Sequence, residues 1–123
     1  MTPFELPSTE QEIFDIVANH LLTQGTQSLR LDKFGDEQCV YRGTKNTKCA
    51  AGILIPDEHY SKKLEEHSWL KLVEKGFAPY RFAFLISELQ SIHDMHKPIR
   101  WKEKLEELAK TQKLEWKFSN DTL

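Results

Sequence analysis

The segment that most constrains the fold covers residues 39–57, CVYRGTKNTKCAAGILIPD. It consists of two extended arms around a polar turn, and residues 50–55 of the second arm carry no polar side chain. A short apolar run that ends at a proline is typical of a strand buried on both faces. We therefore predict a central antiparallel β-hairpin built on residues 38–43 and 48–55.

The register of this hairpin decides whether the two cysteines can meet. If the turn centres on Thr44, Cys39 and Cys49 lie opposite each other. If it centres on residues 45–46, Arg42 pairs with Cys49 and the two cysteines point to opposite faces. Only the first register allows a disulfide. With just two cysteines in the chain, free thiols in a reducing cytoplasm are the expectation.

Helical patterns precede and follow the predicted hairpin. Residues 8–11 (STEQ) have the form of a capping box, and apolar residues then recur at helical spacing. This first helix is expected to end at Gln24, because Gly25 suits a helix stop. A further helix is expected between a cap at Ser61 and a stop at Gly76.

The second half of the chain carries the clearest helix. Residues 80–96 contain one apolar stripe, and Lys97-Pro98 breaks it. Pro98 can open a last helix that buries Trp101, Leu105, Leu108 and Ala109. Two shorter patterns are of the strand type. Residues 26–31 indicate a short strand before a loop at 32–37, and residues 114–118 (LEWKF) alternate strictly. The latter segment favours a third strand, with a frayed helix end held by Trp116 as the alternative.

These elements predict an α+β fold. A small antiparallel sheet, made of the central β-hairpin and a C-terminal strand, packs against about four helices. The chain has 123 residues, of which 39% are hydrophobic and 29% charged. That size and balance suit a single globular domain over residues 1–123.

Composition also excludes several classes of function. The net charge of −2 gives no electrostatic basis for general nucleic-acid binding. No apolar run approaches the ~20 residues that a membrane helix needs. The first residues, MTPFELP, lack the features of a secretory signal. We therefore expect a cytoplasmic protein that does not bind membranes. The phosphate-binding glycine patterns GxGxxG and GxxxxGK[ST] are absent, and no cofactor is predicted.

His93, Asp94 and His96 form the first candidate site. Two histidines three residues apart share a helical face and could bind one metal ion. The His-Asp doublet resembles that of metal-dependent phosphohydrolases with an HD signature, which would need further ligands such as His67 and Asp121. The favoured alternative places His93 at the wet end of the buried stripe, with Asp94 and His96 ending the helix.

Cys49 is a second candidate, as a nucleophile in the positive field of Arg42 and Lys48. Because free cysteine packs as a small hydrophobe, a buried structural role is the favoured interpretation.

The third and preferred candidate lies around the hairpin turn and its exit. An arginine can hold a phosphate or carboxylate with two hydrogen bonds, and a tyrosine can stack on a ring. Exposed Arg and Tyr side chains are common anchors of binding sites. The set comprises Tyr41, Arg42, Lys45, Lys48, Asp57 and Tyr60. Its alternative is a solvated hairpin tip with a core tyrosine.

Most of the chain resembles a group of small uncharacterised bacterial and bacteriophage proteins. The likeness is carried by Tyr41-Arg-Gly43, by KCAAGILIPD at 48–57 with Tyr60, and by LQSIHD at 89–94 followed by Trp101. The resemblance implies a bacterial or phage source and a shared architecture for the hairpin exit and the His93-Asp94 helix end. It carries no residue roles.

We therefore expect a small non-catalytic binding protein. It would capture a partner protein or a small anionic, nucleotide-like ligand, as a modulator of host machinery or an inhibitor of host defence. The expected site residues are Tyr41, Arg42, Lys48, Asp57, Tyr60, His93 and Asp94. One alternative is a metal-dependent phosphoester or nucleotide hydrolase that uses His93, Asp94 and His96. Another is a structural subunit with an exposed patch around Trp69, Trp101 or Trp116.

Overall fold

The elements of the fold are known from a computed structural model that describes residues 3–118. Six regular elements follow one another along the chain: α1 (Glu10–Gln24), β1 (Leu29–Leu31), β2 (Glu37–Cys39), α2 (Trp69–Glu74), α3 (Ala83–Met95) and α4 (Pro98–Thr111). Short 3₁₀ turns cover Thr44–Asn46, Gly52–Leu54, Asp57–His59 and Lys62–Leu64 between β2 and α2. The predicted α+β class, with a small antiparallel sheet and four helices, is confirmed.

Helix α1 begins one residue later than its predicted capping box. Thr9 is the N-cap: its Oγ1 accepts the N–H of Glu12 at 3.1 Å and lies 3.0 Å from the Glu12 carboxylate. The capping box is therefore 9–12, and both positions fit the same pattern of a hydroxyl followed three residues later by Glu or Gln. The predicted end is confirmed, because Gly25 adopts φ 68° and donates its N–H to Leu21.

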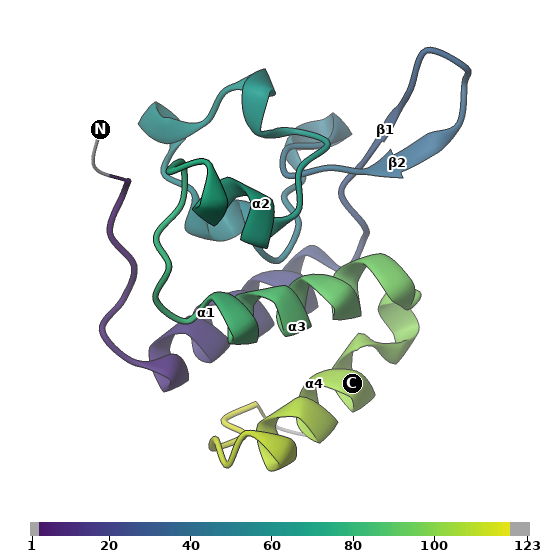
Figure 1. Cartoon of the computed structure of the whole chain (residues 1–123). Helices are drawn as coiled ribbons and strands as arrows, with labels where there is room; N and C mark the ends of the chain where they lie inside the picture. Colours follow the sequence, from purple (N-terminus) through teal and green to yellow (C-terminus); the bar gives the residue numbers. More distant parts are fainter. Residues whose placement is uncertain (1–2, 119–123) are drawn as a thin grey trace.

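Helices α3 and α4 follow the sequence prediction closely. Helix α3 lies within the predicted range 80–96 and buries its apolar stripe, and α4 opens at Pro98 as expected. The inward residues predicted for α4 are all buried: Trp101, Leu105, Leu108 and Ala109. Helices α1, α3 and α4 pack on one another in pairs. Figure 1 shows them together on one side of the molecule, with α2 and the irregular segments on the other.

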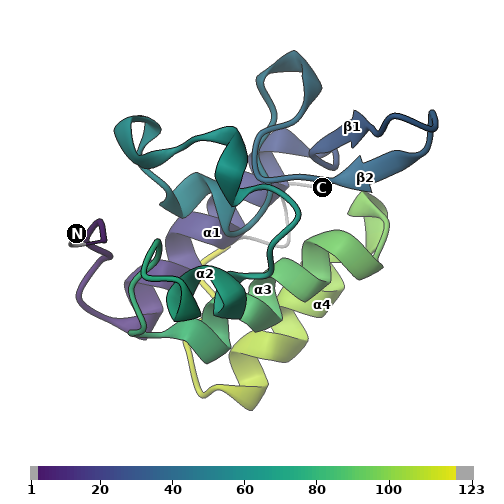
Figure 2. The same ribbon diagram turned by 45° about the horizontal axis from the view of Figure 1, so that its top comes forward.

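The predicted pairing of the sheet is wrong. Strand β2 pairs with the preceding strand β1, with Arg30 opposite Gln38. Of the predicted pairing between 38–43 and 48–55, only an isolated bridge between Arg42 and Lys48 remains. Neither predicted turn register gives this pair. The short β1–β2 hairpin extends away from the helices (Figure 2).

The buried segment 50–55 is not a strand. It contains the 3₁₀ turn Gly52–Leu54 and passes through the core, where Ala50, Ala51 and Ile55 are buried. Its apolar composition therefore reflects burial alone, because a buried turn and a buried strand require the same side chains.

The helix predicted from Ser61 to Gly76 is divided in two. A 3₁₀ turn covers Lys62–Leu64, and α2 begins at Trp69 after a cap in which Ser68 Oγ accepts the N–H of Lys71. Between them Glu66 has a φ of 71°, which is incompatible with a continuous helix. Helix α2 therefore has only 6 residues.

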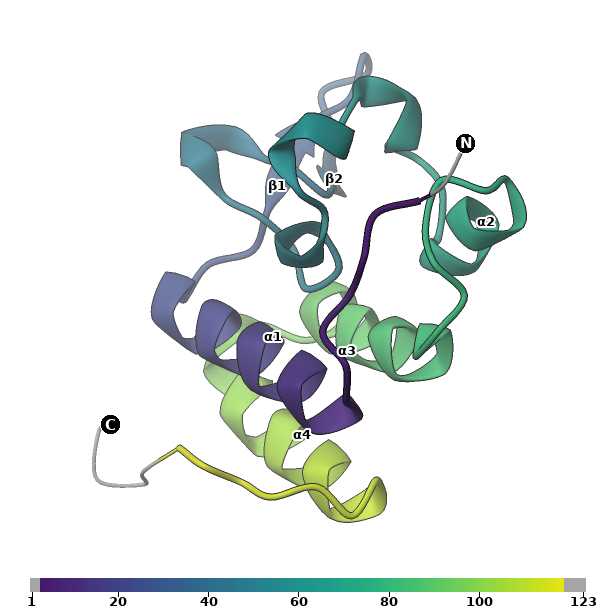
Figure 3. The same cartoon turned by 90° about the vertical axis from the view of Figure 1, so that its left-hand side faces the viewer.

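Residues 114–118 form neither the third strand nor a frayed helix end. They run extended past α1, where the side-chain amide of Gln11 accepts the N–H of Glu115 at 2.9 Å and donates to its carbonyl at 3.1 Å. The Trp116 ring lies edge-on to Phe14, with 6.2 Å between ring centroids. This segment is the yellow trace in Figure 3. Within residues 3–118, no helix combines the length and the apolar character that a membrane crossing requires.

Candidate functional site

Arg42, Asp57 and Tyr60 lie together, as the preferred site prediction grouped them. Nη1 of Arg42 donates to Asp57 Oδ1 at 2.7 Å, and Nη2 donates to the carbonyl of Ile55 at 2.6 Å. The guanidinium lies over the Tyr60 ring, 4.7 Å from its centroid. The Arg42 side chain is only 17% exposed. Both ends of its fork are therefore occupied by groups of the protein itself.

Asp57 pairs with both positively charged side chains of this group, Arg42 and Lys48. Its Oδ1 lies 3.7 Å from Nζ of Lys48 as well as close to Arg42. The hydrogen bond from Arg42 and the charges of Lys48 and Arg42 lower the pKa of Asp57. Because the Asp57 carboxylate already pairs with both Arg42 and Lys48, a small anion would have to displace it in order to bind here.

Glu65 organises the same region, although sequence analysis did not single it out. Its carboxylate accepts the backbone N–H groups of Tyr41 and Arg42, at 2.9 and 3.2 Å, and the Tyr60 hydroxyl at 2.6 Å. Burial and then the hydrogen bond to Glu65 raise the pKa of Tyr60 to about 12. The Glu65 carboxylate thus accepts two backbone N–H groups that a neighbouring strand would otherwise bind through its carbonyls.

Tyr41 belongs to the core rather than to the exposed surface. It is 6% exposed, and its hydroxyl donates to the carbonyl of His67 at 2.5 Å. Its pKa is raised, first by burial and then by the neighbouring Cys49, Glu65 and Asp94. Tyr41 therefore ties the chain after β2 to the chain before α2.

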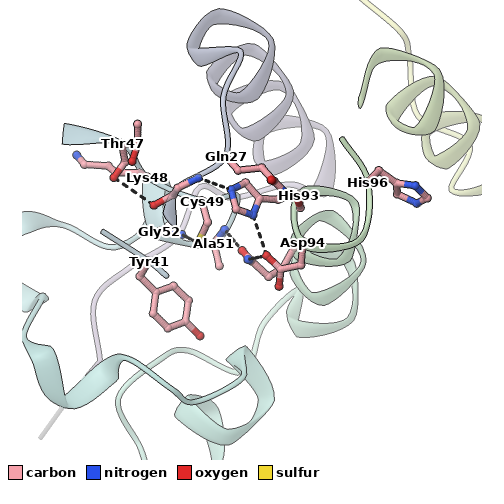
Figure 4. Close-up of polar contacts among 12 residues, drawn as sticks. Gln27, Tyr41, Thr47, Lys48, Cys49, Ala51, Gly52, His93, Asp94 and His96 are labelled. Carbon is pink, nitrogen blue, oxygen red and sulfur yellow. Dashed lines mark hydrogen bonds and ion pairs between the residues drawn. The ribbon is translucent and has the colours of Figure 1, made fainter. Parts of the chain in front are cut away.

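His93 is completely buried, and its hydrogen bonds define its tautomer. Nε2 accepts the backbone N–H of Ser28 at 2.9 Å, so this nitrogen carries no proton. The proton is on Nδ1, which donates to Asp94 Oδ1 at 2.7 Å (Figure 4). The ring also stacks on Trp101 with 5.5 Å between centroids. His93 is therefore a neutral bridge between α3 and the start of the hairpin.

Asp94 faces a cluster that could be taken for a metal centre. One ligand atom each from Cys39, His93 and Asp94 lies within 4.8 Å of the others. A metal on Nδ1 of His93 would need the ring proton to move to Nε2, where it would face the N–H of Ser28. The hydrogen-bond pattern therefore disfavours metal binding at this cluster.

The other ligands considered for a metal-dependent hydrolase do not complete a set around His93. The side chain of His96 points away from His93 and Asp94 (Figure 4). Asp121 lies outside the residues that the structure describes. The grouping of His93 with His96 on one metal is thus not supported by their arrangement.

Both cysteines are free, and both thiols are held in the protonated form. Cys39 is exposed and Cys49 is buried. Although Cys39 is exposed as a residue, partial desolvation of its thiol, followed by the charge of Asp94, raises the pKa of Cys39 to about 11. Burial raises the pKa of Cys49 to about 12. Because the thiolate is the nucleophile, neither side chain has the environment of a reactive cysteine.

A cleft of about 440 Å³ lies between α3 and two other segments, residues 39–41 and residues 65–70. Asp94, Gln90, Ser87 and Ser91 line it from α3, and Leu70 lines it from α2. The remaining lining comes from Cys39, Val40, Tyr41, Cys49 and residues 65–69. Of the predicted site residues, Tyr41 and Asp94 reach this cleft, whereas Arg42, Lys48, Asp57 and Tyr60 do not.

Glu66 and the serines of the cleft were missed by sequence analysis. They occur in segments predicted as plain helix, and nothing in the local pattern separates them from solvated helix positions. Ser87, Gln90 and Ser91 lie between the members of the apolar stripe, where polar residues of a helix normally occur. No protein-family model, curated protein or solved structure matches this chain.

Proposed function

We propose that the chain is a small non-catalytic binding protein, acting in the cytoplasm, that holds a partner protein against the cleft beside α3. The observation that carries this proposal is the combination of a polar cleft with exposed apolar side chains next to it. Leu70, in the lining itself, is 55% exposed, and Phe84 is 71% exposed. Exposed apolar and aromatic side chains are enriched in protein interfaces and mark interaction sites.

Phe84 stands on the same face of α3 as the serines of the cleft. Ser87 and Ser91 follow it at i+3 and i+7, which places all three along one side of the helix. Helix α2, which brings Leu70, packs against α3. The partner-binding face that we propose therefore consists of Leu70, Phe84, Ser87, Ser91 and Asp94.

Partner capture is favoured over capture of a small anion. The anion proposal depended on Arg42 and Lys48, whose charges are directed at Asp57. It is also favoured over hydrolysis, because the neutral tautomer of His93 and the protonated thiols supply neither a metal site nor a nucleophile.

A role as a structural subunit has less support than capture of a separate partner. It would call for an exposed tryptophan patch, whereas Trp69 and Trp101 are buried and Trp116 is partly buried against the core. The resemblance to bacterial and bacteriophage proteins suggests the setting: modulation of host machinery or inhibition of host defence. Within that proposal, the mechanism would be steric occupation of the partner.

A photocrosslinking amino acid placed at Ser87 tests this proposal in living cells. We expect a covalent adduct with one protein at this position and none with the same amino acid at Lys110, on the exposed side of α4. The substitution Phe84→Asp should abolish the adduct without unfolding the chain, because an acidic residue in the first turn suits a helix N-terminus.

Two results would contradict the proposal. Equal adducts from Ser87 and Lys110 would mean that the cleft face has no preference. An adduct of twice the mass of the chain would identify self-association in place of a separate partner.

A further inference from the structure

The cleft beside α3 is lined by acidic groups, and His67 is the basic residue among its described lining residues. Glu65, Glu66 and Asp94 contribute carboxylates, and among the described residues no lysine or arginine side chain lines it. The chain as a whole carries 17 lysines and arginines against 19 acids, so the imbalance is local. A neighbouring hollow of about 620 Å³ shares Glu65 and Glu66 but adds Arg30 and Lys62. That hollow also contains Asp32, so its three acids face two bases, whereas the described lining of the cleft has three acids and neither lysine nor arginine.

The hydrogen-bond donors of two carboxylates in the cleft, those of Asp94 and Glu65, are neutral groups. Asp94 Oδ1 accepts from the neutral His93 ring and from the amide of Gln90, at 2.7 Å each. Glu65 accepts from two backbone N–H groups and from the hydroxyl of Tyr60. Such donors fix the direction of a carboxylate without cancelling its charge. The cleft thus presents oriented negative charges to whatever enters it.

The pKa values of two thiols and a phenol in the lining of the cleft are raised. Burial is the main cause that raises the pKa of Cys39, Cys49 and Tyr41, and Asp94 raises each of them further. Burial disfavours a cation as well as an anion, so the part of these shifts that favours a cation here is the contribution of the Asp94 charge.

Trp69, which lines the same cleft, carries a buried donor without a partner among the described residues. Trp69 is 2% exposed and lines the cleft, and its Nε1–H has no acceptor among residues 3–118. A buried indole N–H without a partner costs free energy, and an acceptor brought by a ligand would recover it. The complementary ligand therefore combines a positive charge with a hydrogen-bond acceptor. A peptide that carries a basic side chain has both, the acceptor being its backbone carbonyl.

We propose that the cleft binds a lysine or arginine side chain of a partner protein, with Asp94 and Glu66 as its carboxylate contacts. This inference rests on the proposed partner-binding function and specifies the chemistry of the partner. The alkyl stem of the basic residue lies against Leu70, as long cationic side chains commonly lie along apolar surface. Ser87 and Ser91 offer further acceptors to an ammonium or a guanidinium group.

The test uses two short peptides that differ in one charge. Acetyl-Gly-Arg-Gly-amide and its citrulline analogue are titrated into the ¹⁵N-labelled full chain and followed by NMR. We expect the arginine peptide to shift the amide signals of Ser68, Ser87 and Ser91, and the neutral analogue to leave them unchanged. The lysine peptide should act like the arginine peptide.

Variants that remove one carboxylate each show which residues of the cleft contact the arginine peptide. Asp94→Asn and Glu66→Gln should each weaken binding of the arginine peptide about tenfold, the effect of losing one charge-assisted hydrogen bond. Glu88→Gln is the matched control, because Glu88 lies exposed on α3 outside the cleft lining. Asp94→Asn could disturb the fold because Asp94 binds the buried ring of His93. In that case Glu66→Gln still tests the inference.

Equal shifts with both peptides, absence of shifts with either, or an equal loss in Glu88→Gln would overturn the inference. Its failure can be separated from failure of the proposed function. If the crosslinked adduct at Ser87 persists in Glu66→Gln and Asp94→Asn, the partner binds without a basic side chain in the cleft. If there is no adduct at all, both proposals fail.

Discussion

Gly52 lies where the buried segment 50–55 meets the backbone of Tyr41. A Cβ at this position would overlap the carbonyl oxygen of Tyr41. Tyr41 has little freedom to move away, because its N–H is bound by Glu65 and its hydroxyl by His67. We expect Gly52→Ala to lower the free energy of unfolding by about 3 kcal/mol, the upper range for overpacking in a core. Urea denaturation at unchanged m-value measures the loss.

Gly25→Ala serves as the control for Gly52→Ala. Gly25 has a φ of 68°, but nothing lies within 4 Å of an added Cβ. Its substitution should cost about 1 kcal/mol, from the left-handed backbone alone. A smaller loss for Gly52→Ala than for Gly25→Ala would show that the segment yields easily and that close approach is not what selects glycine there.

Single residues also show where prediction of the site stops. The types of Arg42, Asp57 and Tyr60, and their closeness in sequence, were enough to predict that they lie near one another. The sequence did not predict that Arg42 is bound by Asp57 and by the Ile55 carbonyl. These contacts depend on how the chain turns after Gly52. The role of Glu65 was missed for the same reason, because the two backbone N–H groups that it binds, those of Tyr41 and Arg42, lie 24 and 23 residues before it in the sequence.

Among the elements, three of the four helices and the short strand within 26–31 were predictable, whereas the length of α2 and the pairing of the strands were not. Helices α1, α3 and α4 are specified by local periodicity and by their end signals. In contrast, the backbones of segments 48–55 and 114–118 are bound by glutamine side chains. Gln24 binds Lys48, Gln90 binds Ala51 and Gln11 binds Glu115, across separations of 24, 39 and 104 residues. A side-chain amide offers a donor and an acceptor as a strand does, so apolar or alternating composition alone cannot distinguish the two arrangements.

Helix α1 and the chain at Lys48 form a contact that should respond to pH. His20 Nε2 lies 2.8 Å from the Lys48 carbonyl and donates to it. Burial nevertheless lowers the pKa of His20 below its ordinary 6.5, outweighing this hydrogen bond. The unfolded chain therefore takes up this proton at a higher pH than the folded one. We expect the His20 contribution to stability to be complete above about pH 6.5 and to be lost as the pH falls toward the lower folded pKa.

The His20→Gln variant isolates that contribution. Glutamine can still donate to the Lys48 carbonyl but does not titrate. Thermal unfolding between pH 7.5 and 5.5 should show a smaller decrease of Tm in His20→Gln than in the parent chain (pH values about one unit on either side of the ordinary pKa). His96→Gln, on the far side of His93 from Lys48 in Figure 4, should keep the parental slope. Identical slopes for all three chains would mean that the pKa of His20 is not lowered in the fold.

At the scale of the whole molecule, the fold divides into a helical base and a hairpin with little support. Val17 on α1 and Leu89 on α3 are fully buried, whereas every residue of β2 is exposed. At the hairpin end, the N–H of Asp32 is bound only to the carbonyl of Asp36, close to solvent. Local opening of the hairpin should therefore require much less free energy than global unfolding.

Hydrogen exchange measures this difference directly. We expect the amides of Val17 and Leu89 to exchange only on global unfolding, and the amide of Asp32 to have a protection factor at least about a hundredfold lower. The amide of Ser28, at the base of the hairpin, should follow the helices, because it is bound to the buried ring of His93. Equal protection of Asp32 and Leu89 would instead make the hairpin part of the global folding unit. Since Cys39 at the end of β2 lines the cleft, independent opening of the hairpin would let the wall of the cleft adjust to a partner while the face on α3 stays fixed.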